Sequence, residues 1–252
     1  MRKLVALALA AVLPGVAFGQ EKLSGTNVDT RMVLAFKISD AAIRNLVPAG
    51  WEVNAPSSGP ARGANLNVVL VNSVSAQDAE GKPVKPNRGI ALVIPAKKTS
   101  SDAAGPMVVT GLFAPHYAPG AYGVFLPANV NTERKLHTDP EGKVSVEETW
   151  DVQSTDGHSI HIRVAYLHGT PARGKVESKV YSGAKPDFFR IYRVEQATDV
   201  ARSTETGVDR VSSYSLKASG PKLSVLNDGS AQLVAITAIP WYSRSVYVVP
   251  GL

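Results

Sequence analysis

The sequence contains no cysteine among its 252 residues. No disulfide can link distant parts of the fold, and no thiolate can serve as a nucleophile or a zinc ligand. Stability must come from a hydrophobic core, which a chain of this length with 44% hydrophobic residues can form. There is no internal repeat and no long low-complexity linker, so residues 20–252 are expected to form a single domain.

A strong excess of charge of one sign is also missing. The formal net charge of +6 falls by two, to +4, if Arg2 and Lys3 are removed with a leader. The basic pairs at 97–98 and 134–135 have no aromatic residues interleaved with them, as single-stranded nucleic acid binding would require. We therefore expect no nucleic-acid partner.

Long hydrophobic runs are missing after the N-terminus. The chain opens MRKLVALALAAVLPGVAFGQ, with two basic residues, an apolar run from Leu4 to Val12 and a small-residue site before Gln20, which is typical of a secretory signal. The apolar run is shorter than the roughly 20 residues of a membrane-spanning helix. We predict a signal peptide at 1–19, no membrane span, and a periplasmic or secreted mature protein.

Motifs of several enzyme classes are absent as well. There is no G-x-S-x-G, P-loop or dinucleotide glycine pattern, so acyl hydrolysis and nucleotide binding have no support. Three of the five histidines fall in DGHSIHIRVAYLHG, residues 156–169. In a strand, His158 and His161 point to opposite faces, and His158 and His168 lie roughly 33 Å apart. We therefore predict no metal and no cofactor, with His158 and His168 as strand-edge residues.

The sequence does contain strand-like alternation along most of its length. In RMVLAFKI, residues 31–38, Met32 and Leu34 share an apolar face, as expected of a half-buried strand. A helix is predicted from its cap at Ser39 to Pro48, and a second one near 230–239. Further strands are predicted at 66–74, 89–95, 106–114, 144–152, 158–166, 173–181, 187–194, 208–216 and 243–249.

Residues 144–152 and 158–166 are expected to form an antiparallel hairpin. With a five-residue loop, Glu147 lies opposite Arg163 as an outer charge pair. Glu148 lies opposite Ile162, on the face of Trp150, where a carboxylate must find a partner or have its pKa raised by desolvation. The alternative is that Glu148 is a simple surface acid. We take Glu148 and Trp150 as candidate substrate-binding residues.

Two arginines share strand faces with apolar residues. Arg210 lies on the face of Val208, and Arg244 on that of Val246. Each is either a fixed cation for a substrate carboxylate or a strand-end arginine whose stem covers apolar surface while its head reaches water. The second interpretation is favoured for both, and Arg210 is kept as a candidate substrate-binding residue.

The order of these features resembles a known family. The run MVLAFKISDAAIRNLVPAGWEVN, residues 32–54, is similar to the opening of the acetoacetate decarboxylase family. The likeness continues through GPMVVTGLFAPHYAPGAYGVFLPAN, residues 105–129, and over most of the mature chain. The resemblance implies an α+β, mostly β fold: a closed antiparallel cone-like β-barrel with a few flanking helices and a cavity for a small oxo acid. This chain would be a divergent, secreted member.

That family forms a Schiff base between a ketone substrate and a lysine in a Pro-Lys-Lys segment. The segment most similar in position is LPAN, residues 126–129, which has no lysine. By position, Arg31 matches an arginine of the first strand and Glu80 an acidic residue of a polar loop, so the resemblance makes both candidate catalytic residues. Without it, Arg31 is a strand-end charge and Glu80 belongs to a polar turn.

Three functions remain open. The first is binding or transformation of a small organic acid or ketone without a lysine Schiff base. The second is an active decarboxylase that uses Lys135, Lys97 or Lys98, and the third is a non-catalytic interaction module of the cell envelope. The missing lysine favours the first function, and an interior cavity would separate it from the third. The sequence does not decide whether the protein is an enzyme or forms a homo-oligomer.

Overall fold

The computed structural model describes residues 20–251, most of which lie in β-strands. The strands are β1 (Lys22–Lys37), β2 (Trp51–Val53), β3 (Leu66–Asp78), β4 (Arg88–Lys98), β5 (Ala104–Phe113), β6 (Phe125–Thr138), β7 (Val144–Ser154), β8 (Ser159–Leu167), β9 (Ala172–Ser182), β10 (Phe189–Ser203), β11 (Val208–Asp209), β12 (Val211–Ser219) and β13 (Gln232–Val248). Within these residues, helical structure is limited to α1 (Asp40–Arg44) and the 3-10 helix η1 (Pro221–Leu226), and neither is long and apolar enough to cross a membrane. The predicted mostly β architecture is confirmed.

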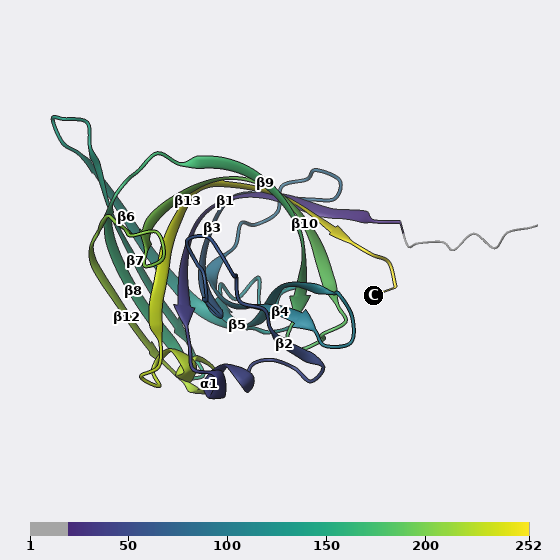
Figure 1. Ribbon diagram of the computed structural model, residues 1–252. Helices are drawn as coiled ribbons and strands as arrows, with labels where there is room; N and C mark the ends of the chain where they lie inside the picture. Colours follow the sequence, from purple (N-terminus) through teal and green to yellow (C-terminus); the bar gives the residue numbers. More distant parts are fainter. Residues whose placement is uncertain (1–19, 252) are drawn as a thin grey trace, which may run out of the picture.

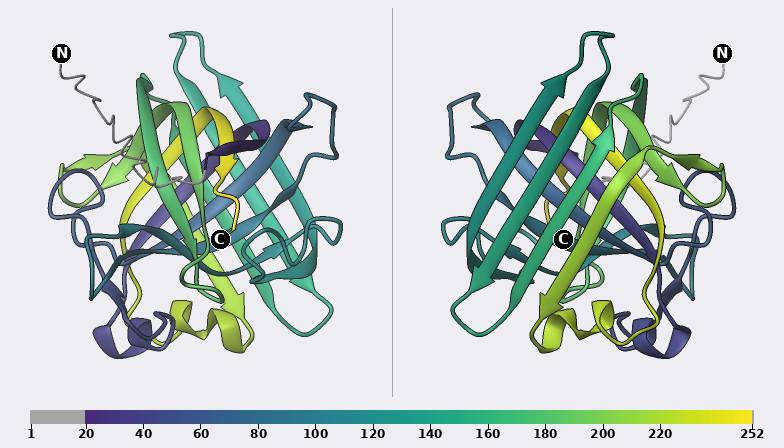
Figure 2. Two further views of the ribbon diagram at one scale, coloured as in Figure 1. Left: turned by 90° about the vertical axis from the view of Figure 1, so that its right-hand side faces the viewer. Right: turned by 90° about the vertical axis from the view of Figure 1, so that its left-hand side faces the viewer.

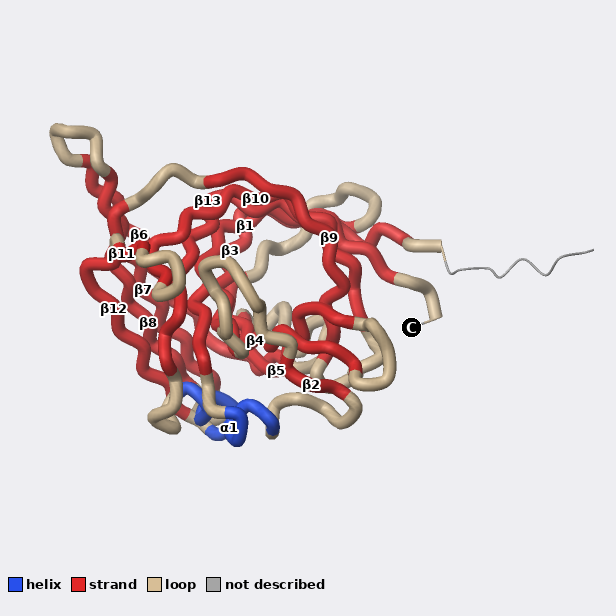
Figure 3. The backbone as a smooth tube through the Cα atoms, viewed as in Figure 1, coloured by secondary structure: helices blue, strands red, loops and turns tan. Residues whose placement is uncertain are grey.

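Seven of the strands form a closed ring. The hydrogen-bonded order runs β5-β9-β10-β13-β1-β3-β4, and β4 pairs again with β5 to close the barrel. Figure 1 looks into this ring, and Figure 3 shows that its wall consists almost entirely of strands. The predicted antiparallel barrel needs one correction, because β5 runs parallel to β9.

A second sheet lies against one side of the barrel. Strands β6, β7, β8 and β12 pair antiparallel in that order. A short parallel pairing of β6 with β5 connects them to the barrel. The right-hand view of Figure 2 shows this sheet, with the β6–β7 hairpin projecting beyond the barrel. On this side the barrel is covered by strands rather than by flanking helices.

The main hydrophobic core includes side chains from both the barrel and the second sheet. Met32 and Leu34 of β1 are buried in one cluster with Trp150 of β7. The face predicted to be buried is therefore the one that packs against the second sheet. The alternate residues of β1, Arg31 and Val33, line the interior of the barrel.

Only one of the two predicted α-helices forms. Ser39 is the N-cap of α1, and its Oγ accepts a hydrogen bond from the Ala42 amide at 3.3 Å. The helix predicted at 230–239 is wrong, because these residues begin β13. Ile236 packs into the main core and the adjacent Ala235 into a smaller cluster, so neighbouring residues bury both faces. A strand buried on both faces is continuously apolar and shows no alternation.

The hairpin β7–β8 forms with a register shifted by two residues from the prediction. Glu148 pairs with Val164 rather than Ile162, because β7 continues into the stretch expected to be loop. An even shift keeps every side chain on its predicted face. The predicted ion pair also forms, on the diagonal, with 2.6 Å between Arg163 Nη2 and Glu147 Oε1.

Candidate functional site

The barrel contains a cavity of about 410 Å³. Its lining comes from all seven ring strands and from the loop between β5 and β6. Most of the lining side chains are apolar, among them Val33, Val69, Val108, Val180 and Ile239. An apolar cavity with a few polar groups is the usual form of a small-molecule site.

Two arginines reach this cavity from neighbouring strands. Arg31 lies on β1 and Arg244 on β13, where Arg244 is opposite Asn27. Each guanidinium lies over a tyrosine ring: the Cζ atom of Arg31 is 3.6 Å from the ring centroid of Tyr242, and that of Arg244 is 4.2 Å from the centroid of Tyr192. Such cation–π contacts hold a guanidinium in place while leaving its in-plane N–H donors free.

A buried carboxylate connects the two arginines. Asp29, 1% exposed, accepts a hydrogen bond from Arg31 Nε at 2.9 Å. It also accepts one from Asn27 Nδ2 at 2.6 Å, and Asn27 Oδ1 accepts from Arg244 Nε at 2.8 Å. Both guanidinium groups are thus fixed by one hydrogen-bonded chain. Within residues 20–251 the Nη atoms of Arg244 donate to no protein acceptor, so they remain available to a ligand.

Arg244 is not the strand-end arginine that the sequence favours. Its guanidinium lines the cavity instead of reaching bulk water. Burial opposes its charge, but the acidic groups around it, Tyr192 first and also Asp29, outweigh that effect and raise the pKa of Arg244. It is therefore a fixed cation inside the barrel.

Tyrosine hydroxyls add hydrogen-bonding groups to the same cavity. Tyr122 donates a hydrogen bond to the hydroxyl of Tyr192. Burial, and after it the nearness of Tyr192, raises the pKa of both Tyr122 and Tyr117. Tyr122 and Tyr117 therefore stay neutral at physiological pH and can donate hydrogen bonds. Because Tyr122 is the donor of the pair, the hydroxyl hydrogen of Tyr192 is left for another acceptor.

Sequence reasoning missed most of this site. The predicted first strand begins at residue 31, whereas β1 begins at Lys22. Extending the alternation backwards from Arg31 would have placed Asn27 and Asp29 on the same face, although a polar strand end gives little reason to do so. No local pattern indicates Tyr122 or Tyr192.

Among the five residues predicted for the site, Arg31 alone lines the cavity. Glu80 is exposed in the turn after β3, where its backbone amide donates to the Asp78 side chain at 3.1 Å. The polar-turn interpretation describes its position, and the expectation that Glu80 reaches the cavity is not met.

Trp150 and Glu148 lie in the packed second sheet and do not line the cavity. Trp150, 2% exposed, donates its indole N–H to Glu148 Oε1 at 2.7 Å. Arg134 Nε lies 3.8 Å from the other carboxylate oxygen. Burial raises the pKa of Glu148, although the Trp150 hydrogen bond and the Arg134 charge oppose the shift. The expected pKa perturbation is therefore present outside the cavity.

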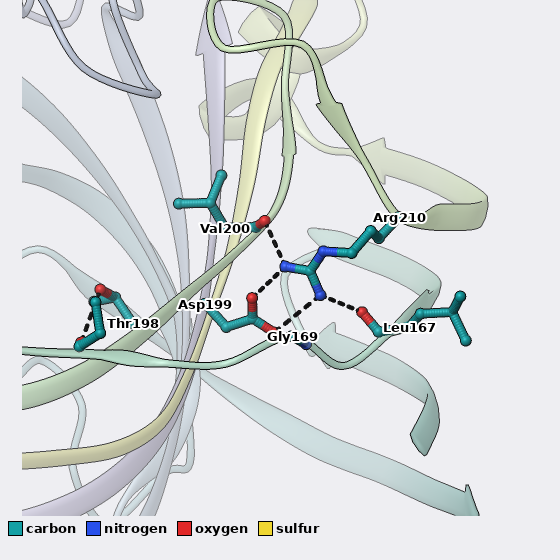
Figure 4. A network of polar contacts seen from close by, with 7 residues as sticks. Leu167, Gly169, Thr198, Asp199, Val200 and Arg210 are labelled. Atoms are coloured by element: carbon teal, nitrogen blue, oxygen red, sulfur yellow. Dashed lines mark hydrogen bonds and ion pairs between the residues drawn. The ribbon is translucent and has the colours of Figure 1, made fainter. Parts of the chain in front are cut away.

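Arg210 belongs to a structural network (Figure 4). It donates hydrogen bonds to the buried carboxylate of Asp199 and to the backbone carbonyls of Leu167 and Val200. The amide of Gly169 also donates to Asp199, at 2.7 Å. Burial opposes the charge of Asp199, but these hydrogen bonds outweigh it and lower the pKa of Asp199. Arg210 thus joins β8, β10 and the start of β12 and does not line the cavity.

The three lysines considered as nucleophiles form surface ion pairs. Lys135, Lys97 and Lys98 lie 3.1, 3.1 and 2.9 Å from carboxylate oxygens of Glu133, Glu52 and Asp187 respectively. In the described part of the chain, no lysine lines the cavity.

The histidines do not converge on one point. His158 is 6% exposed, with Nδ1 2.9 Å from Asp156 Oδ1, so it is a buried residue rather than an exposed strand edge. His161 pairs with Asp151 at 2.5 Å on the outer face. Over residues 20–251, no group of three or more His, Asp or Glu side chains is arranged to hold a metal ion.

Comparison with known proteins identifies the fold. Neither a protein-family model nor a curated protein matches the sequence. The enduracididine biosynthesis enzyme MppR with HEPES buffer bound aligns with a TM-score of 0.51 and 9% identity, over 98% of this chain and 97% of that chain. MppR complexed with the condensation product of pyruvate and imidazole 4-carboxaldehyde aligns with a TM-score of 0.51 and 9% identity, over 96% of this chain and 95% of that one. An acetoacetate decarboxylase-like enzyme from Sphingomonas wittichii RW1 aligns with a TM-score of 0.47 and 12% identity, over 96% and 97% of the two chains.

This chain has the fold of MppR. At 9 to 12% identity the likeness concerns the fold alone. The roles of residues in this barrel therefore rest on its own cavity and on the groups that line it.

Proposed function

We propose that this protein binds a small organic acid, with or without a ketone group, in the barrel cavity and holds the acid's carboxylate on Arg31 and Arg244. The observation that supports this most directly is the free pair of Nη donors on Arg244 beside an apolar wall. A planar guanidinium pairs with a carboxylate through two parallel hydrogen bonds. The low dielectric of the cavity strengthens that attraction relative to water.

The proposal includes chemistry without a lysine Schiff base. The cavity lining offers hydroxyl donors but, in the described residues, no amine. A Tyr192 hydroxyl that already accepts from Tyr122 can donate to a carbonyl oxygen of the ligand and polarise it. Lys135, Lys97 and Lys98 do not line the cavity, so the decarboxylase function that uses one of them is not favoured.

Calorimetric titration with linear carboxylates of two to eight carbons tests the binding function. Saturable binding of at least one of these acids is expected, with a stoichiometry of one per chain. If no acid of the series binds, the cavity has another use, and the third function, a non-catalytic envelope module, becomes the better explanation.

Borohydride reduction in the presence of acetoacetate tests the chemistry. We expect the intact mass of the protein to stay unchanged and no carbon dioxide to be released. A reduced adduct that peptide mapping places on Lys135, Lys97 or Lys98 would overturn this part of the proposal and restore the decarboxylase function.

A further inference from the structure

We infer that the acid bound in this cavity is a monocarboxylate with an extended apolar body, not a short oxo acid and not a dicarboxylate. The inference rests on the proposed function and specifies its ligand class. Three properties of the cavity support it: its net charge, its volume and the placement of both cations on two adjacent strands of an otherwise largely apolar wall.

The charge of the cavity matches one carboxylate. Arg31 and Arg244 bring two positive charges, and no acidic side chain lines the cavity within the described residues. Directly behind the wall, Asp29 accepts two hydrogen bonds from Arg31 and neutralises one charge. One ligand carboxylate balances the charge that remains. A second carboxylate would be buried without a partner, which is strongly unfavourable.

The volume of the cavity exceeds what a short acid needs. Its 410 Å³ lie within the range of roughly 300–1,000 Å³ that is typical of sites for drug-sized ligands. An acid of two to four carbons would leave most of the apolar wall in contact with trapped water. Replacing this water with methylene or aromatic groups gains the free energy of apolar burial.

The two charged side chains lie on one part of the wall, to which β1 and β13 also contribute the apolar Val33 and Ile239. Arg31 and Arg244 come from the adjacent strands β1 and β13. Strands β3, β4 and β5 contribute apolar side chains that include Val69, Val93 and Val108. An amphipathic molecule with one anionic head and an apolar body satisfies both parts.

A matched series of acids tests the inference on the wild-type protein. We expect calorimetry to show about fourfold tighter binding for each methylene added from butanoate through hexanoate to octanoate. Octanedioate has the length of octanoate but two carboxylates, and we expect it to bind at least tenfold more weakly. Equal affinities along the series, or tighter binding of octanedioate, would overturn the inference while the proposed function survives. Absence of binding by every acid would overturn both.

Two variants separate the charge argument from the volume argument. Asp29→Asn keeps the shape of a buried side chain and removes its charge, so the preference for octanoate over octanedioate should fall at least fivefold. Val69→Phe fills part of the cavity, so octanoate should bind at least tenfold more weakly while butanoate stays within twofold. An unchanged preference in Asp29→Asn, or equal losses for both acids in Val69→Phe, would contradict the inference. If Asp29→Asn does not fold, the wild-type series and Val69→Phe still decide it.

Discussion

Arg210 and Arg244 both lie on strand faces with apolar neighbours, but their hydrogen-bond partners differ. The guanidinium of Arg210 is engaged by Asp199 and by two backbone carbonyls. Among residues 20–251, the guanidinium of Arg244 hydrogen-bonds to protein only through Nε, and Arg244 lines the cavity. A cation whose Nη donors are engaged by protein acceptors stabilises the fold, whereas one with free Nη donors can bind an anion.

Replacing each arginine by glutamine should separate these two roles. Arg244→Gln is expected to weaken carboxylate binding at least tenfold, because a charged hydrogen-bond donor is lost from a low-dielectric site. Arg210→Gln leaves the Asp199 carboxylate without its cation and should lower the free energy of unfolding by roughly 3 kcal/mol, with binding by the folded protein within twofold of wild type. Calorimetry and urea unfolding measure the two effects. The reverse pattern would refute the assignment.

The raised pKa of Glu148 leads to a separate prediction about how stability depends on pH. Its pKa is raised on folding, so the folded state holds the proton more tightly than the unfolded state. The tighter binding of this proton stabilises the folded state. The stabilisation is fully present at a pH below the ordinary pKa of 4.5 and is lost as the pH rises through the raised pKa. Glu148→Gln keeps an acceptor for the Trp150 indole and removes the buried charge.

The Glu148→Gln variant should therefore be more stable than wild type at neutral pH, and the difference should vanish below pH 4.5. Thermal unfolding across this pH range is the measurement. Glu147→Gln, on the exposed face of the same strand, is the control, and its effect should stay within roughly 0.5 kcal/mol. A stability difference between Glu148→Gln and wild type that persists unchanged at acid pH would exclude desolvation of Glu148 as its cause.

Among the elements, the pairing of β4 with β5 closes the barrel and depends on a glycine. A Cβ added at Gly111 would collide with the backbone oxygen of Ile90 and lie 2.9 Å from Phe125 Cδ1. Gly111→Ala is expected to lower the free energy of unfolding by about 2 kcal/mol, because the two strands must move apart. Gly174→Ala on β9 is the matched control: a Cβ there has no atom within 4 Å, and the change should stay within roughly 0.5 kcal/mol. Equal effects in denaturant unfolding would show that closure tolerates the added methyl group.

The elements also show why some features were predictable and others were not. The alternation at Met32 and Leu34 indicates the buried face of β1, because the other face of that strand lines a cavity and carries Arg31. The faces of the β7–β8 hairpin were predictable because apolar and polar residues alternate along β8 and along parts of β7, although the register depends on where the turn begins. The contact between Arg244 and Asn27 joins residues 217 positions apart, and it exists only because β13 pairs with β1. No local pattern contains that information.

At the scale of the whole molecule, the interior of the barrel, and not the likeness of fold, indicates what the protein can bind. Barrels of roughly eight strands either fill their interior with side chains or hold one small ligand. Here that space holds two fixed cations and neutral phenols in an otherwise apolar wall. Its contents, rather than the identity of 9% with MppR, support a ligand-binding function.

The predicted cleavage site before Gln20 lies two residues ahead of β1 in the sequence. Strand β1 begins at Lys22, and Glu21 already contacts Arg193 Nη2 at 2.7 Å. Cleavage before Gln20 would therefore leave every strand described for residues 20–251 in the mature chain. We expect the exported protein to have the mass of residues 20–252 and to occur in the soluble fraction outside the cytoplasm.

A chain that lacks residues 2–19 is the control for export. It should stay in the cytoplasm and bind carboxylates with unchanged affinity, because the residues that line the cavity, among them Arg31 and Arg244, are all retained. Intact-mass measurement after cell fractionation distinguishes the outcomes. Recovery of a chain that keeps residues 1–19 in the membrane fraction would show that the N-terminal segment is an anchor, and the carboxylate site would then act at a membrane surface.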